Sequence, residues 1–160
     1  GKDCKNCKDN KYDPNTSSYF QEGVGIEKYL SYGTFMSVTA KRVQDQVCLK
    51  SFSLCVEPVS FMLASEQNGI NAMLDGILGM APGFKPRGDK LPSDFKTGPL
   101  FLNYLYDAAH ITEKSFSTCF TGNAGNNFVD FGPYNVNEMS NKDDLVKIPV
   151  NKDFFYSAIP

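Results

Sequence analysis

The sequence predicts a mainly β fold of packed antiparallel sheets with one or two short helices. Short segments rich in β-branched and aromatic residues recur along its 160 residues, and glycine, proline and asparagine residues separate them. Hydrophobic residues make up 41% of the chain, which is enough apolar surface for a folded core. This length fits one compact domain or one lobe of a larger protein. The clearest strand candidates are residues 25–30, 43–49, 59–63 and 127–131.

One segment favours a helix. Between Pro99 and Ala109, Phe101 and Leu105 recur at helical spacing within a broad apolar face, and Pro99 suits a first helical turn. His110 follows directly, where an imidazolium interacts favourably with the carbonyl end of a helix. Because no matched nucleophile accompanies it, we do not interpret His110 as a catalytic base.

Charge and hydropathy exclude two classes of partner. Sixteen basic and eighteen acidic residues leave a formal charge of -2, and no basic stripe is longer than Lys41-Arg42, so we expect no nucleic-acid partner. No apolar run approaches the roughly 18 residues that cross a bilayer, so we expect no membrane span in this chain. The residues from Gly1 to Cys4 lack a signal-peptide core, and we expect any signal peptide to lie upstream.

The five cysteines form two close pairs and leave one over. The pairs are Cys4 with Cys7 and Cys48 with Cys55. A zinc site needs about four ligands, yet the only histidine, His110, lies far along the chain from both pairs. We therefore predict two short-loop disulfides and no metal or other cofactor. Cys119 either packs as a small buried hydrophobe or pairs with a cysteine outside this chain.

Two features point to the secretory pathway. Disulfides form in oxidising compartments. The triplet Asn15-Thr16-Ser17 is an acceptor for N-linked glycosylation, with Asn15 as the modified residue. We predict a secreted protein or one in the lumen of a vacuole, lysosome or other secretory compartment.

A series of motifs occurs in a characteristic order. A short Cys4–Cys7 loop precedes Asp13-Pro14-Asn15-Thr16-Ser17-Ser18-Tyr19, and Tyr32-Gly33-Thr34 follows a predicted strand. Residues 75–81 read Asp-Gly-Ile-Leu-Gly-Met-Ala, and residues 111–120, 128–132 and 145–156 continue the series. The series resembles the N-terminal lobe of the pepsin-like aspartic endopeptidases. Residues 75–81 nearly copy the Asp-Gly-Ile-Leu-Gly-Leu-Ala segment of that family.

The resemblance implies a pepsin-like acid protease lobe and an organisation into two parts. Residues 1–144 are expected to form an N-terminal lobe that lacks its first strands, and residues 145–160 a strand leading toward the second lobe. We expect 75–81 to be a buried central strand, in which Gly76 and Gly79 allow close approach of neighbouring backbone.

The resemblance also implies peptide hydrolysis, although the chain lacks the catalytic motifs. The family uses two aspartates, each in an Asp-Thr-Gly or Asp-Ser-Gly triplet, and neither triplet occurs here. The resemblance places one triplet upstream of Gly1 and the other beyond Pro160. We therefore expect no catalytic residue in this chain and no activity from this fragment alone.

Tyr32, Gly33 and Thr34 correspond to the flap, the hairpin that closes over bound peptide in this family. Tyr32 would donate a hydrogen bond toward the aspartates, and Gly33 and Thr34 would offer backbone groups to an extended peptide. The family continues with glycine and serine, whereas this chain has Phe35 and Met36. Either the tip adopts another turn or the flap no longer closes over substrate.

Three functions follow from these observations. The first is an endopeptidase whose partners are a peptide or protein substrate and a second lobe of the same protein. The second is an inactive pepsin-like module with a binding or structural role in an assembly. The third is an unrelated disulfide-stabilised β domain, which the ordered series of motifs disfavours.

Overall fold

The structure is a computed structural model that describes residues 1–7, 10–23, 27–32, 34–69, 75–80, 100–120, 122, 125, 127–135, 146–148, 150–151 and 157–158. These residues form two compact units. The first comprises the described residues up to Gly79, and the second comprises Met80 and the described residues from Leu100 onward.

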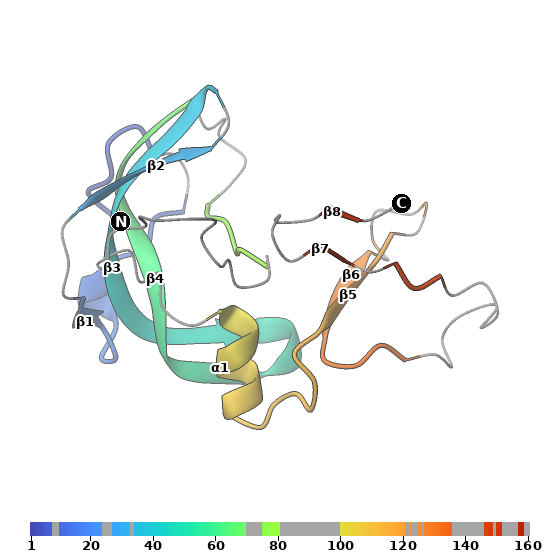
Figure 1. Ribbon diagram of the computed structural model, residues 1–160. Helices are drawn as coiled ribbons and strands as arrows, with labels where there is room; N and C mark the ends of the chain where they lie inside the picture. Colours follow the sequence, from blue (N-terminus) through green and yellow to red (C-terminus); the bar gives the residue numbers. More distant parts are fainter. Residues whose placement is uncertain are drawn as a thin grey trace. The chain divides into compact units, whose positions relative to one another are not determined.

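Antiparallel strands dominate the described residues, with one short α-helix, which confirms the predicted fold class (Figure 1). Along the chain the elements are η1 (Pro14–Thr16), β1 (Gln21–Glu22), β2 (Lys28–Tyr32), β3 (Met36–Leu49), η2 (Lys50–Phe52), β4 (Leu54–Asn68), α1 (Phe101–Asp107), β5 (Phe116–Cys119), β6 (Phe128–Phe131), β7 (Val150–Asn151) and β8 (Ser157–Ala158). The predicted strands at 43–49, 59–63 and 127–131 coincide with parts of β3, β4 and β6. Of the one predicted at 25–30, residues 25–26 lie outside the described residues.

The first unit is built on β3, which pairs with three other strands. β4 follows it along nearly its whole length, and β1 and β2 pair with different parts of it, all antiparallel. Two register shifts, between Thr39 and Ala40 and between Asp45 and Val47, interrupt the β3–β4 ladder. Such bulges bend and twist a strand pair, in agreement with the strong curvature of this hairpin in Figure 1.

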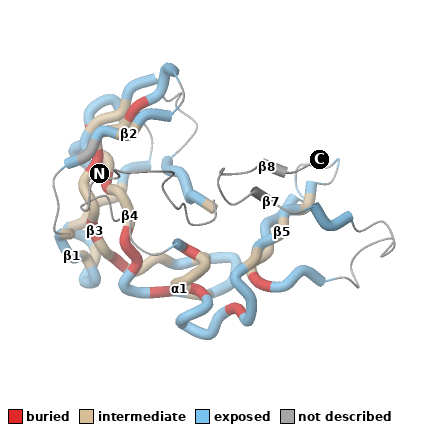
Figure 2. Tube along the Cα trace, in the orientation of Figure 1, coloured by how far each residue is buried: buried red, intermediate tan, exposed pale blue. Residues whose placement is uncertain are grey.

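The core of the first unit lies along the β3–β4 hairpin (Figure 2). β-Branched residues suit these positions because they pack well on a pleated, half-buried surface. The buried apolar residues of these two strands are Ala40, Val43, Val56, Val59 and Leu63. The tip formed by the end of β2 and the start of β3 is mostly exposed.

In the second unit, α1 contacts β6 through an aromatic pair. Phe101 and Leu105 are buried on one face of the helix, as their spacing predicted, and the ring of Phe101 meets that of Phe131 edge-on at 5.8 Å. The helix ends where Ala109 adopts a left-handed φ of 58°. The prediction of a helix is thus confirmed over Phe101–Asp107, while Pro99 lies outside the described residues.

The predicted buried strand at 75–81 is wrong for the residues that the structure describes. Residues 76–80 have no regular secondary structure, and the side chains of Ile77 and Leu78 are 60% and 52% exposed. A Cβ added at Gly76 or Gly79 would meet no atom within 4 Å, so neither glycine is required by close packing here. The physical reason is that a central strand needs hydrogen-bonded neighbours, and no described strand pairs with this segment.

The C-terminal residues contain one short strand pair. Val150 lies opposite Ala158, and Asn151 lies opposite Ser157, in the antiparallel β7–β8 pair. The assignment of 145–160 to a strand leading toward a second lobe, and of 1–144 to the first lobe, stays a prediction.

Candidate functional site

The predicted flap lies at the turn between β2 and β3. Tyr32 is the last residue of β2 and pairs directly with Met36, the first residue of β3. Thr34 and Phe35 form the turn, and Gly33 lies outside the described residues. Residues directly opposite each other on an antiparallel pair project to the same face, so Tyr32 and Met36 share one face of the hairpin.

The tip presents large side chains to solvent. Phe35 is 88% exposed, Met36 is 41% exposed and Tyr32 is 36% exposed. Among the described non-glycine residues, left-handed φ values occur at Asn6, Ser53 and Ala109, and Phe35 does not join them. The turn therefore accommodates Phe35 without the positive φ that would strain it.

The sulfur atoms of both predicted cysteine pairs lie within bonding distance. Cys48 lies directly opposite Cys55 in the β3–β4 ladder, with a Cα–Cα distance of 4.0 Å, so this disulfide links the two strands next to their turn. Cys4 and Cys7 are linked with a Cα–Cα distance of 5.5 Å. Cys119 is not bonded to any of the other four cysteines of this chain and is half-buried in β5.

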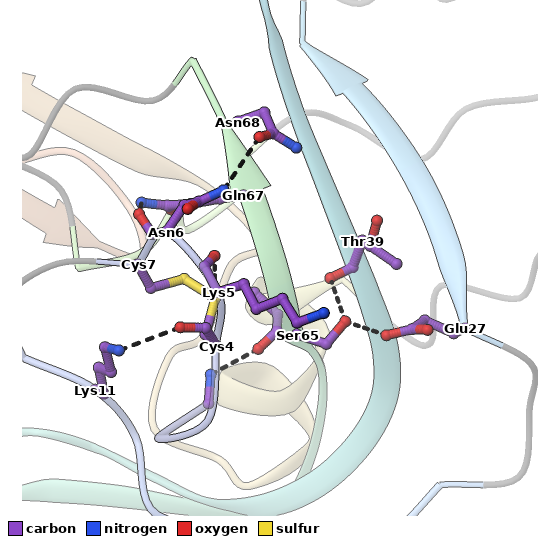
Figure 3. Close-up of a disulfide and its surroundings, with 12 residues drawn as sticks. Cys4, Lys5, Asn6, Cys7, Lys11, Glu27, Thr39, Ser65, Gln67 and Asn68 are labelled. Carbon is purple, nitrogen blue, oxygen red and sulfur yellow. Dashed lines mark hydrogen bonds between the residues drawn. A yellow bond between two sulfur atoms is a disulfide. The ribbon is translucent and has the colours of Figure 1, made fainter.

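The loop closed by Cys4 and Cys7 is attached to β4 through backbone hydrogen bonds (Figure 3). The Lys5 N–H donates to the Ser65 carbonyl at 2.8 Å, and the Gln67 N–H donates to the Lys5 carbonyl at 3.1 Å. The Ser65 hydroxyl also contacts the Thr39 carbonyl and the Glu27 carboxylate, which joins β4 to the start of β2. The loop and the β2–β3 hairpin are therefore parts of one hydrogen-bonded network.

Asp45 is a buried carboxylate on β3, with 2% of its surface exposed. It accepts hydrogen bonds from the Tyr12 hydroxyl, from the Ser17 hydroxyl at 2.6 Å and from the Gln46 N–H at 2.7 Å. Burial alone would raise the pKa of Asp45, but these three donors outweigh it and hold the pKa below its usual value. Burial, together with the bond to Asp45, raises the pKa of Tyr12 well above its ordinary range.

Sequence reasoning missed this cluster, although one signal was present. Val43, Asp45 and Val47 alternate along a predicted strand, so a carboxylate occupies a position in register with buried valine. Of its two side-chain donors, Tyr12 directly precedes the motif that begins with Asp13-Pro14, and Ser17 lies within that motif. The arrangement satisfies the carboxylate completely and anchors the N-terminal segment to β3, so it supports structure rather than chemistry.

Asp75, the first residue of the Asp-Gly-Ile-Leu-Gly motif, is also engaged in a structural contact. Its two carboxylate oxygens accept hydrogen bonds from the backbone N–H of Asn10 at 3.2 Å and from the Asn10 side-chain amide at 3.0 Å. The proton sharing of an aspartic dyad needs a second carboxylate, whereas the partner of the Asp75 carboxylate among the described residues is the amide of Asn10. Asp75 therefore does not stand in for a catalytic aspartate.

The predicted glycosylation residue lies on a short exposed turn. Asn15 is exposed within η1, and its backbone N–H donates to the Asp13 carboxylate at 3.0 Å. Ser17, the third residue of the triplet, is turned inward to Asp45 at 2.6 Å. The acceptor side chain thus lies on the surface while the residue that completes its motif is bound to the sheet.

Neither metal nor base chemistry is indicated by the remaining candidates. Within the described ranges, no three histidine, cysteine, aspartate or glutamate side chains come together as metal ligands. His110 is exposed after α1, and its backbone N–H donates to the Leu105 carbonyl at 2.9 Å. This backbone bond closes the end of the helix, as the interpretation of His110 as a helix-end residue expects.

In the part of the chain that the structure describes, none of the helices has the length and apolar character needed to cross a membrane.

A comparison with protein families identifies one family that matches nearly the whole chain. The sequence model of the eukaryotic aspartyl protease family matches residues 1–159. The chain belongs to the eukaryotic aspartyl protease family. No curated protein matches it significantly. In this aspartyl protease family member, the Asp45 and Asp75 carboxylates are both occupied by structural hydrogen bonds.

Proposed function

We propose that this chain is part of an aspartic endopeptidase that hydrolyses peptide bonds with two aspartates on sequence outside residues 1–160. The family match over residues 1–159 carries the proposal. The exposed β2–β3 tip supports it, because Tyr32 and Thr34 are available there to a bound peptide.

The chemistry requires two carboxylates that share one proton. Two adjacent carboxylates cannot both ionise at low cost, so one acts as a base toward water while the other acts as an acid toward the substrate. The contribution of this chain is to hold the peptide. An extended peptide pairs through its backbone with an exposed hairpin, and Gly33 and Thr34 supply backbone groups for this purpose while Tyr32 supplies a phenol.

The test uses the full-length protein with the sequence that flanks residues 1–160. We expect it to cleave an unfolded protein substrate at acid pH and to be inhibited by a peptide that carries a hydroxyl in place of the scissile carbonyl. Tyr32→Phe removes one hydrogen bond to a charged group, so kcat/KM should fall about ten- to a hundredfold. The matched control is Tyr29→Phe on the same strand, where Tyr29 is 69% exposed and activity should stay within twofold of wild type, roughly the scatter of a surface change.

A second function is favoured by one observation. The bulky, 88% exposed Phe35 stands at the tip where the family has small residues, which suits a module that binds a partner rather than one that closes over substrate. If either flanking triplet lacks its aspartate, or the full-length protein binds peptides without cleaving them, the inactive module replaces the endopeptidase as the proposed function.

The compartment belongs to the same proposal. The Cys48–Cys55 and Cys4–Cys7 disulfides, the exposed Asn15 and the family all favour a secreted or lumenal glycoprotein. The lumen of a vacuole or lysosome is also acidic, which suits a proton-sharing pair of carboxylates.

A further inference from the structure

Gly69 follows β4 and lies beside the tip of the β2–β3 hairpin. Its φ is +73°, a conformation that favours glycine. A Cβ built at this position would overlap the carbonyl of Phe35 and would lie 3.4 Å from the Cα of Met36. Any side chain at residue 69 would therefore displace the backbone of the tip or of Gly69 itself.

The approach of Gly69 continues the pairing between β3 and β4. Ser37 pairs with Ser31 of β2 on one side and with Asn68 of β4 on the other, and it is 8% exposed. The hairpin is thus supported on a second edge up to its turn. A two-stranded hairpin alone is marginally stable in water, so this third strand limits how far the tip moves.

The backbone that Gly69 contacts determines where the exposed side chains of the tip stand. Phe35 carries the carbonyl in question, and Met36 follows it opposite Tyr32. A shift of this backbone moves the phenol of Tyr32 and the side chains of Phe35 and Met36 together. The small size of residue 69 is therefore coupled to the geometry of the flap.

We propose that Gly69 is a positioning residue of the flap. Because Gly69 has no side chain, the Phe35 carbonyl packs against the end of β4, and this seating of the tip fixes the distance between the tip and a bound peptide. The catalytic consequence rests on the proposed endopeptidase function, whereas the seating of the tip does not. Misplacing a substrate-positioning group by about 1 Å can cost about a hundredfold in rate.

The test compares three glycine-to-alanine variants in the full-length protein. Gly69→Ala introduces both an unfavourable φ and the overlap with Phe35. Gly132→Ala introduces an unfavourable φ of +103° with ordinary contacts of 3.5 Å to Ile111, and Gly122→Ala meets no atom within 4 Å. The difference in hydrogen exchange and activity between Gly69→Ala and Gly132→Ala therefore separates the effect of the overlap from that of the unfavourable φ.

Two readouts separate the seating of the tip from the activity. Amide hydrogen exchange in a fragment covering residues 34–38 should be faster in Gly69→Ala and unchanged in the other two variants. With the concentration of active sites measured by titration with a tight inhibitor, kcat/KM should fall about ten- to a hundredfold in Gly69→Ala only, mainly through kcat.

Each outcome decides one of the two claims. Unchanged exchange at residues 34–38 in Gly69→Ala overturns the positioning role, whatever the activity. Faster exchange with an equal loss of kcat/KM in Gly69→Ala and Gly132→Ala assigns the loss of activity to backbone strain and overturns the catalytic consequence. If the wild-type protein cleaves no peptide, the proposed function fails, and the exchange measurement still decides whether Gly69 seats the tip.

Discussion

The phenol of Tyr12 donates a hydrogen bond to the carboxylate of Asp45, 33 residues further along the chain. The ring of Tyr12 also packs edge-on against Phe61 of β4, with ring centroids 5.5 Å apart. The segment before β1 is thus held by one polar and one aromatic contact to the two longest strands. Ser17 adds a second hydrogen bond to the same carboxylate, so Asp45 organises the attachment of residues 12–17.

Replacing Asp45 by alanine should destabilise the protein. The change leaves the hydroxyls of Tyr12 and Ser17 without their acceptor, and an unsatisfied buried polar group costs about 1–3 kcal/mol. Urea unfolding should show a lower midpoint with an unchanged slope. Asp3→Asn, at an exposed carboxylate, should keep the wild-type midpoint. An Asp45→Ala midpoint equal to that of wild type would show that the network adds nothing to stability.

The stability that Asp45 contributes should depend on pH in the acid range. Its pKa is lower in the folded protein than in the unfolded chain, so the folded state binds this proton less readily. The contribution is present above the unfolded pKa of about 4 and is lost as the pH falls through the folded pKa. The difference in unfolding free energy between wild type and Asp45→Asn should therefore be constant near neutrality and shrink below about pH 4. A gap that stays constant down to pH 2 would contradict the assignment.

Removing the Cys48–Cys55 disulfide should lower stability by a moderate amount. The bond closes a loop with a sequence separation of 7, for which loss of unfolded-state entropy corresponds to about 2–3 kcal/mol. The double variant Cys48→Ser, Cys55→Ser should show this loss in urea unfolding, whereas Cys119→Ser should show little because Cys119 is bonded to no other cysteine of this chain. Alkylation of the unreduced, denatured protein should label Cys119 alone among the five cysteines. Label on Cys48 or Cys55 would contradict the pairing.

Asn15 should carry an N-linked glycan when the protein passes through the secretory pathway. Its side chain is exposed on η1, so a glycan there meets no packed surface. A glycosidase that removes N-linked glycans should increase gel mobility of the secreted protein, and Asn15→Gln should abolish the shift. Ser17→Thr keeps the acceptor motif and a hydroxyl for Asp45, and it should keep the shift. Identical mobility of wild type and Asn15→Gln would exclude modification at this residue.

The local features of this fold were predictable where neighbouring residues determine them. Helical spacing placed Phe101 and Leu105 on the buried face of α1, and short spacing paired Cys48 with Cys55. Richness in β-branched and aromatic residues located parts of β3 and β4. Their full lengths of 14 and 15 residues were not predictable, because each strand continues through polar residues that are held by pairing with the other strand.

The sequence-based predictions missed, or described wrongly, the features that depend on contacts between residues distant in sequence. Ile77 and Leu78 have the composition of a buried strand, but burial requires partners that no local pattern specifies, and both are exposed. Asp45 is buried against Tyr12 and Ser17, which lie 33 and 28 residues earlier in the chain and donate hydrogen bonds to it. No local sequence pattern specifies which distant residues will satisfy a buried carboxylate. Gly69 likewise gains its constraint from Phe35, across a strand pair.

The attachment of the Cys4–Cys7 loop has a consequence for the protein among other molecules. An uncovered outer strand offers unpaired N–H and C=O groups that recruit strands from other chains. Lys5 forms a parallel bridge with Glu66 and occupies backbone groups of Ser65 and Gln67, so part of the free edge of β4 is already taken. The short disulfide loop thereby blocks this part of the β4 edge from pairing with a strand of another molecule. The side chain of Lys5 adds a charge that a second sheet would have to bury.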